Sequence, residues 1–140
     1  MKKINLLISP KQLGNLGEKI ARDYLERKKY KILSQNFKRK WGEIDIVAKK
    51  KFFFAKTAED REKIVFFEVK SIQKREGFLP EDEIDWKKKR QLWKMAQIYL
   101  SENKISFRTP WQIDIIALEI FPDFKKAKIR HFENVIEDIY

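Results

Sequence analysis

The sequence predicts an α/β fold in which a mixed β-sheet is flanked by α-helices. Two segments, at about 9–25 and 85–100, repeat their apolar residues at the spacing of a helix. Between and after them lie short runs rich in β-branched and aromatic residues, which are typical of strands. The order is one helix, three strands, a second helix and further strands. This order favours helices packed on a mixed sheet, and the length of 140 residues predicts one domain over 1–140.

The first helix has a clear start signal. Ser9 is a good N-cap residue, Pro10 suits the first turn, and Gln12 stands three residues after the cap. One side of the predicted helix is apolar and should pack on the sheet; it carries Leu13, Leu16, Gly17, Ile20, Ala21, Tyr24 and Leu25.

Three strands are expected before the second helix, at 30–37, 44–48 and 64–69, and the first of them should lie at an edge of the sheet. The charged segment 49–63, with phenylalanine at 52, 53 and 54, predicts an extended hairpin or a mobile loop. Side chains alternate along a strand, so at least one of these rings should be exposed. Exposed aromatic clusters often mark interfaces. This segment is therefore a candidate homodimer surface, and a hairpin folded onto its own domain is the alternative.

The second half of the chain predicts a helix at about 85–100 after a loop with Gly77 and Pro80. A buried strand should follow at 113–120 and another strand near Ile129, with a helical turn at 135–140. Trp41 and Trp86 could stack on bases, but core packing is the expectation for both.

The charge of the chain is strongly positive. It contains 32 Lys and Arg against 21 Asp and Glu, a formal net charge of +11. Such a field attracts polyanions and indicates a nucleic-acid partner, DNA in the first place with RNA as a second candidate. A merely soluble, lysine-rich protein is the alternative reading.

Two residue types limit the chemistry. There is no cysteine, which excludes disulfides, thiol catalysis and thiolate-bound metals. The single histidine, His131, fits a surface or packing role better than a catalytic one. A metal would have to be bound mainly by oxygen, which favours Mg²⁺ or Mn²⁺.

No stretch of the sequence predicts a membrane segment. The apolar run at 4–8 is too short for a signal peptide, and no run approaches the roughly 18 apolar residues of a membrane span. We expect a soluble, cytoplasmic protein with no membrane partner.

Two strand segments carry the candidate chemistry. Glu43 and Asp45 share one side of the segment that leads into the strand at 44–48. Glu68 and Lys70 share one side of the segment at the end of the strand at 64–69. If these strands are neighbours, Asp45 approaches Glu68 with Lys70 beside them. Two carboxylates about 4 Å apart repel by roughly 4 kcal/mol at an effective dielectric constant near 20, and a divalent metal removes that repulsion.

In this arrangement the carbonyl oxygen of Val69 is a further candidate ligand, and Lys70 could orient water or stabilise charge on a phosphate. The alternative is the solvated face of an ordinary hairpin. Both sites lie within apolar β runs, where a charge needs a partner, so we favour the metal site.

The motifs resemble those of the YraN family, and the resemblance spans nearly the whole chain. The matching motifs, in order, are Gly14-x-x-Gly17-Glu18, Asn36-Phe37, Gly42-Glu43-Ile44-Asp45, Phe67-Glu68-Val69-Lys70, Lys88 with Ala96 and Tyr99-Leu100, and Ile113-Asp114. The fold of that family resembles Holliday-junction resolvases and other PD-(D/E)xK nucleases, so the resemblance implies a restriction-endonuclease-like sheet and a nuclease-like domain.

The resemblance also implies roles for individual residues. Asp45 and Glu68 would be metal ligands, Lys70 the catalytic lysine and Glu18 the first-helix glutamate that completes the centre. A boundary salt bridge is the alternative role for Glu18, and Asp114 fits a structural ion pair better than a ligand. The chain departs from the family pattern in its longer stretch between Asp45 and Glu68. It also has Gln112 where an arginine is usual.

Basic residues flank the proposed centre and are candidate phosphate contacts: Lys38, Arg39, Lys87, Lys88 and Arg90. Lys88 is the first choice, because it matches the family's helix lysine. A solvated helix face is the alternative. Cations near a helix N-terminus oppose its dipole, however, and a bound polyanion would offset that cost.

Together these features predict a Mg²⁺-dependent DNA endonuclease, with branched or damaged DNA as candidate substrates. The alternatives are a nuclease-fold protein that binds nucleic acid without cutting it and a basic RNA-associated structural protein.

Overall fold

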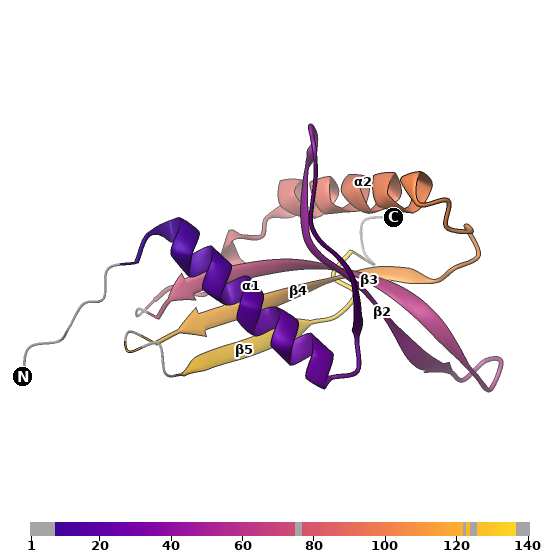
Figure 1. The fold of residues 1–140 in the computed structure, drawn as a ribbon, viewed down its shortest axis with the longest axis horizontal. Coiled ribbons are helices and arrows are strands. Elements are labelled where there is room, and N and C mark those ends of the chain that lie inside the picture. The colour runs from indigo at the N-terminus through magenta and orange to yellow at the C-terminus, as the bar shows by residue number, and fades with distance from the viewer. Residues whose placement is uncertain (1–7, 75–76, 122, 124–125, 137–140) are drawn as a thin grey trace, which may run out of the picture.

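The computed structural model describes residues 8–74, 77–121, 123 and 126–136. Its core is a five-stranded sheet in the order β1-β2-β3-β4-β5, with a helix on each side (Figure 1). The elements are α1 (Pro10–Arg27), β1 (Lys31–Arg39), β2 (Gly42–Phe54), β3 (Glu59–Gln73), the 3₁₀ turn η1 (Pro80–Glu83), α2 (Trp86–Glu102), β4 (Trp111–Ile120) and β5 (Ala127–Phe132).

The sheet is mixed, as predicted. β1–β2, β2–β3 and β4–β5 are antiparallel pairs, whereas β3 and β4 are parallel. η1 and α2 form the crossover that a parallel pair requires. The predicted order of elements and the helix-flanked α/β class are therefore confirmed.

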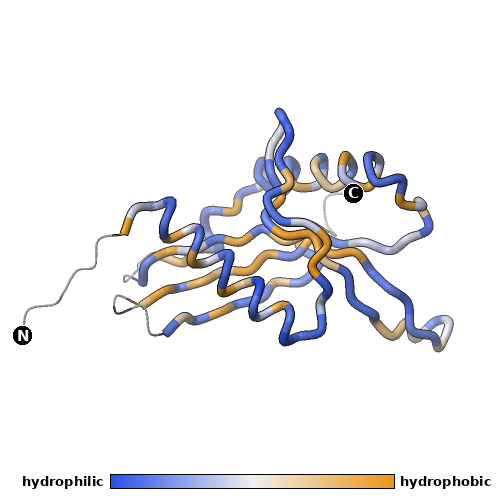
Figure 2. Tube along the Cα trace, in the orientation of Figure 1, coloured by the Kyte–Doolittle hydropathy of each residue, from blue (hydrophilic) through white to orange (hydrophobic). Residues whose placement is uncertain are grey.

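Two hydrophobic cores cover the two faces of the sheet. On the face of α2, Phe66 and Val47 pack with Leu92 and Met95. On the face of α1, the next residue along β3, Phe67, packs with α1 residues that include Ala21 and Leu25. This alternation follows the two-residue period of a strand. Figure 2 shows the hydrophobic positions gathered along the strands of the sheet.

The first helix begins at the predicted signal, and the second begins where its range predicted. Ser9 Oγ accepts the backbone N–H of Gln12 at 3.1 Å, and the Gln12 side chain accepts the N–H of Ser9 at 2.8 Å, which completes a capping box. Asp85 caps α2 by accepting the backbone N–H of Lys88 at 2.8 Å.

The segment 49–63 is the outer part of the β2–β3 hairpin, in which the strands stay paired out to Phe54 and Glu59 (Figure 1). We call residues 49–63 the arm. Of its three phenylalanines, Phe53 is the exposed one, with 67% of its surface accessible. Strand pairing continues through charged residues here, because a strand needs only backbone partners and tolerates polar side chains facing water.

The expectation of core packing for the two tryptophans is wrong. Trp41 is 48% and Trp86 is 56% exposed. Trp41 lies in the β1–β2 turn and Trp86 is the first residue of α2, so both lie outside the two cores. Lys40 lies over the Trp41 ring and Arg90 over the Trp86 ring. Of the helical turn expected at 135–140, residues 135–136 form a turn and the remainder lies outside the described residues.

Two glycines of α1 give a matched test of helix docking. A Cβ on Gly17 would lie 2.8 Å from Cβ of Ser71 on β3, whereas a Cβ on Gly14 would meet nothing within 4 Å. Gly17→Ala should therefore lower the free energy of unfolding by about 1–3 kcal/mol. Gly14→Ala should raise it by up to about 1 kcal/mol through helix propensity. Urea denaturation of both variants checks the pair. Equal effects would show that α1 does not depend on this close approach.

Among the described residues, no helix is long and apolar enough to cross a membrane.

Candidate active site

The candidate site lies where β2 and β3 diverge. Their pairing ends at Ile46 and Phe67; beyond that row β2 pairs with β1, and β3 pairs with β4. Figure 1 shows the β1–β2 hairpin leaving the sheet and running past α2. Asp45 and Glu68 are the first residues past the divergence, one on each strand.

A side chain replaces the lost strand partner at this point. Asp45 Oδ2 accepts the backbone N–H of Val69 at 2.7 Å. An unpaired N–H inside the protein would be costly, so this bond compensates for the divergence. It also fixes the Asp45 carboxylate beside Glu68, which is only 8% exposed.

Four carboxyl groups gather here, from α1 (Glu18), β2 (Glu43 and Asp45) and β3 (Glu68). Burial and the neighbouring charge of Asp45 raise the pKa of Glu68 to about 8. Burial and the charges of Asp45 and Glu43 raise the pKa of Glu18 to about 7. Burial also raises the pKa of Asp45. The carboxyls of the cluster thus resist ionising together, and a bound cation would stabilise their charged forms.

Asn36 on β1 connects two of these carboxylates. With its amide nitrogen turned toward them, it donates to Glu43 Oε1 at 3.1 Å and to Glu18 Oε2 at 3.2 Å. Its backbone is in the left-handed region, with φ of 53°, a conformation that asparagine tolerates better than most residues. Asn36 thereby holds α1, β1 and β2 together at the site.

The two lysines of the site have different partners. Lys88 Nζ lies 3.2 Å from Glu68 Oε1. Lys70 shares a strand side with Glu68, but its Nζ pairs with Glu83 Oε2 of η1 at 2.5 Å. The structure thus brings Asp45, Glu68, Glu18 and Lys88 together and directs Lys70 toward η1.

The other predicted phosphate contacts lie around the β1–β2 turn and the start of α2. Gln91 Nε2 donates to the Trp41 carbonyl at 2.8 Å, which joins these two regions. A Cβ on Gly42 would come within 2.7 Å of the Gln91 side chain, and the φ of Gly42 is +152°, so glycine is required. Lys87 and Arg90 are exposed on α2.

Lys38 and Arg39, at the end of β1, already have carboxylate partners. Lys38 lies 4.0 Å from Glu43. Arg39 binds Glu102 with two nitrogens, at 2.6 and 2.9 Å, and is the least available of the predicted contacts.

A second group could hold a metal. In Asp114, His131 and Glu133, one ligand atom from each lies within 4.8 Å of the others. However, His131 Nε2 is 2.7 Å from Asp114 Oδ2, and Nδ1 is 3.1 Å from the Tyr24 hydroxyl. Octahedral ligands at about 2.1 Å from a metal stand about 3 Å apart. The observed spacing of 2.7 Å is close to this value, so a metal here would take the place of the hydrogen bond between His131 and Asp114.

Asp114 is fully buried and its other oxygen is also satisfied. Oδ1 accepts the Gln112 amide at 2.8 Å and the Asn134 backbone N–H at 2.9 Å. His131 packs against the rings of Tyr24, Tyr30 and Phe67. Both residues thus have structural contacts, in keeping with the roles expected of them.

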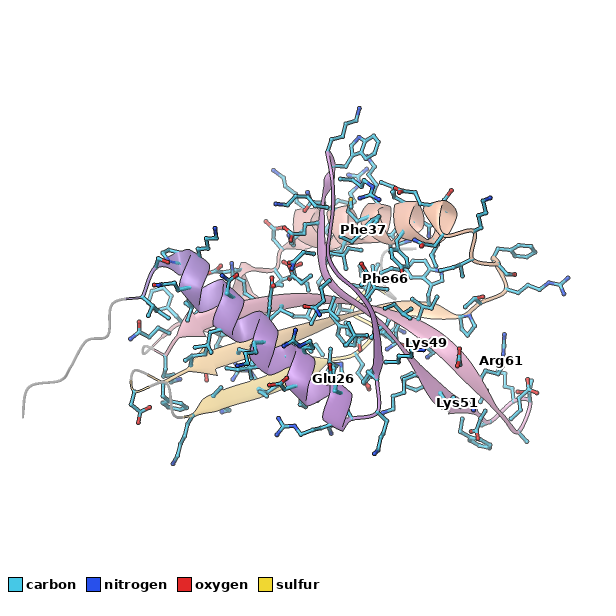
Figure 3. The ribbon with its side chains drawn as sticks, in the orientation of Figure 1. Glu26, Phe37, Lys49, Lys51, Arg61 and Phe66 are labelled. Atoms are coloured by element: carbon cyan, nitrogen blue, oxygen red, sulfur yellow. The ribbon has the colours of Figure 1, made fainter. Side chains whose placement is uncertain are left out.

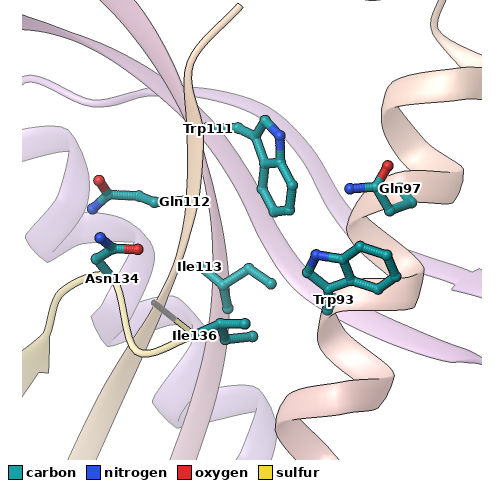
Figure 4. A pocket seen from close by; sticks show the side chains of 7 residues that line it. All are labelled: Trp93, Gln97, Trp111, Gln112, Ile113, Asn134 and Ile136. Atoms are coloured by element: carbon teal, nitrogen blue, oxygen red, sulfur yellow. The ribbon is translucent and has the colours of Figure 1, made fainter. Parts of the chain in front are cut away.

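A pocket of about 440 Å³ lies between α2 and the start of β4. Figure 4 shows Trp93 and Trp111 in its walls, with Gln97, Gln112 and Asn134 around them. None of the four clustered carboxylates lines it, so it is separate from the candidate active site.

The raised pKa values predict how metal-free stability depends on pH. Because folding raises the pKa of Glu68 and Glu18, the folded state binds protons more tightly than the unfolded chain, and stability should fall from about pH 5 to pH 8. Glu68→Gln should remove more than about 1 kcal/mol of that fall. Urea denaturation in EDTA at both pH values measures it. Identical pH slopes for parent and variant would contradict this electrostatic picture.

The geometry identifies two residues that the sequence reasoning did not propose as site residues, Glu43 and Asn36. Glu43 had a usable signal, because it shares a strand side with Asp45. Asn36 had only its place in a matching motif, since nothing local predicts its left-handed backbone or its two carboxylate partners.

The fold and this cluster define the class of protein: an α/β protein with a helix-flanked mixed sheet and with carboxylates where two strands diverge. The sheet is consistent with the nuclease-like sheet that was predicted. A model described as "Uncharacterised protein family UPF0102" matches residues 17–133. The chain belongs to this family, the YraN family, and the resemblance drawn from its motifs is confirmed.

Individual relatives cover most of the chain. A UPF0102 protein of Caldanaerobacter subterraneus is 37% identical over 135 residues, which are 96% of this chain and 98% of that protein. One from Thermodesulfovibrio yellowstonii is 38% identical over 123 residues, 88% of this chain and 94% of that protein. These names assign the family and no activity.

Proposed function

We propose that this protein is a metal-dependent endonuclease that hydrolyses phosphodiester bonds of DNA. The observation that carries the proposal is the divergence of β2 and β3, which places the Asp45 and Glu68 carboxylates together in a partly buried, highly basic protein. Burying like charges opposes folding. A bound cation would offset that cost, which explains why the carboxylates lie together.

The residues present fit Mg²⁺ or Mn²⁺. The carboxylates of Asp45 and Glu68 and the carbonyl oxygen of Val69 would hold the ion, with Glu18 completing the site from α1. An oxygen-only donor set suits these hard cations. When bound, the metal would polarise the phosphodiester and lower the pKa of an attacking water.

The lysines supply the remaining chemistry. Lys88, whose Nζ lies 3.2 Å from Glu68, would contact a phosphate beside the centre. Lys70 is proposed to stabilise charge that develops on the phosphate during attack. To do so its ammonium would leave Glu83, an exposed partner on η1. Lys87, Arg90 and Lys38 would extend the contact along the phosphate backbone.

The second candidate function is nucleic-acid binding without cleavage. The observation that favours it is the Lys70–Glu83 ion pair, which holds the proposed catalytic lysine away from Asp45 and Glu68.

A cleavage panel tests the proposal and separates the two candidates. Duplex, single-stranded, flap and four-way-junction DNA, together with RNA, would be incubated with Mg²⁺, with Mn²⁺ or with EDTA. We expect metal-dependent cuts in DNA, and the flap and four-way-junction substrates test whether branched DNA is preferred. Binding without cleavage of any substrate in either metal would leave the second candidate.

A further inference from the structure

The arm, residues 49–63, has two faces with different charge. Alternation along paired strands separates its side chains into two sets. The basic face carries three cations against one carboxylate and consists of Lys50, Phe52, Phe54, Glu59, Arg61 and Lys63. The balanced face carries two cations against two carboxylates and consists of Lys49, Lys51, Phe53, Asp60 and Glu62. Figure 3 draws these side chains, with Lys49, Lys51 and Arg61 labelled.

The basic face contains an electrostatic conflict. Lys50 and Lys63 stand directly opposite each other in the β2–β3 ladder. Like charges in directly opposed positions destabilise a sheet. On the balanced face, by contrast, Lys49 Nζ lies 3.4 Å from Glu62 Oε2. The pairing of charges therefore favours folding on one face and opposes it on the other.

Aromatic rings hold the cations of the basic face in place. Lys50 Nζ lies 4.8 Å from the Tyr30 ring centre, Lys63 Nζ 4.7 Å from that of Phe52, and the Arg61 guanidinium 5.4 Å from that of Phe54. Lys63 also donates to Gln112 Oε1 and Arg61 to the Arg108 carbonyl. Cation–π contacts offset only part of the repulsion. Rings that already lie against cations are poorly placed to stack on bases. The basic face is therefore suited to contact the phosphate backbone and not the bases.

We propose that the basic face of the arm is a second binding surface of this protein and that its ligand is the phosphate backbone of duplex DNA. The inference rests on the proposed function, because it takes DNA as the substrate. Arg61, the outermost cation of the basic face, stands opposite Phe52, seven residues along β2 from Asp45, which is about 23 Å at about 3.3 Å per residue. This is less than one turn of duplex, about 34 Å, so the arm contacts DNA within one turn of the site of cutting.

Two double variants with the same change in charge test the proposal. Lys50→Gln/Arg61→Gln alters the basic face, and Lys49→Gln/Lys51→Gln alters the balanced face. Binding to a duplex about three turns long is measured in EDTA by fluorescence anisotropy over a range of salt. The basic-face variant should reduce the log–log salt slope by about 1.8, two phosphates at about 0.9 each, and the balanced-face variant by less than half of that.

Thermal unfolding separates lost contact from lost structure. Removing the charge of Lys50 relieves its repulsion with Lys63, whereas removing Arg61 loses its contacts with the Phe54 ring and the Arg108 carbonyl. These effects oppose each other, so the Tm of the basic-face variant should stay close to that of the parent. Lower DNA affinity with a nearly unchanged Tm is the result expected of a binding surface.

Four results would overturn the inference. Salt slopes reduced equally in the two variants would show that total charge alone matters. A parent dimer in sedimentation that the basic-face variant dissociates, with an unchanged salt slope, would make the arm an interface between two copies of this chain. A parent that binds no DNA would overturn the proposed function as well, whereas a parent that cuts DNA while both variants keep its slope overturns this inference alone.

Discussion

Glu68→Gln is expected to abolish metal-dependent cleavage of DNA while the fold and most of the affinity for DNA remain. The substitution removes one anionic ligand and keeps the size of the side chain. It also relieves the repulsion between Glu68 and Asp45, so the metal-free variant should be at least as stable as the parent. Asp45→Asn should have the same effect on cleavage, because asparagine retains an oxygen that can accept the Val69 N–H.

Cleavage rates in Mg²⁺ and Mn²⁺, with circular dichroism and DNA binding for each variant, measure this result. Glu26→Gln is the matched control, since Glu26 is an exposed carboxylate on α1 outside the cluster. The control should cut at the parent rate. If Glu68→Gln or Asp45→Asn also cut at that rate, the metal-site assignment would be wrong.

Lys70→Ala is expected to lower the rate at saturating DNA by on the order of 10²-fold or more, as for other positioned catalytic groups. Lys88→Ala should instead weaken binding and reduce the salt slope by about 0.9, one phosphate contact. Lys88 contacts Glu68, whereas Lys70 pairs with Glu83, so the split between rate and affinity distinguishes charge stabilisation from phosphate contact.

Glu83→Gln gives a second test of Lys70, because its expected result, an equal or higher rate, would not follow from a loss of structure. It removes the charge that holds Lys70 on η1, so Lys70 should reach a phosphate more readily and the rate should stay equal or rise. If Lys70→Ala instead weakened DNA binding and left the rate at saturating DNA unchanged, Lys70 would be a binding residue. A lower rate in Glu83→Gln would mean that the ion pair itself positions Lys70.

Much of the fold could be predicted from local patterns. The Ser9–Pro10–Gln12 signal and the apolar spacing define α1 because caps and periodicity act within a few residues. Two apolar β runs likewise predicted neighbouring strands, which brought Asp45 and Glu68 together in the prediction.

The parts that were missed depend on long-range geometry. No local pattern reveals that β2 leaves β3 after Ile46, and that divergence lets Asp45 bind a backbone N–H. The pairing of Lys70 with Glu83 depends on where η1 returns to the sheet. Trp41 and Trp86 were expected in the core because large aromatic residues usually are buried, but Trp41 lies in the β1–β2 turn and Trp86 begins α2, both outside the packed interior.

The length of the arm also bears on how accurately Asp45 and Glu68 are aligned. Nine consecutive rows join β2 to β3, from Ile46–Phe67 to Phe54–Glu59. A slip of one residue would turn every side chain of one strand to the opposite side and carry Asp45 away from Val69. Each row opposes such a slip, since misalignment would disrupt all of them at once. The pairing of β2 with β3, which the arm lengthens, therefore also fixes the register that brings the two carboxylates together.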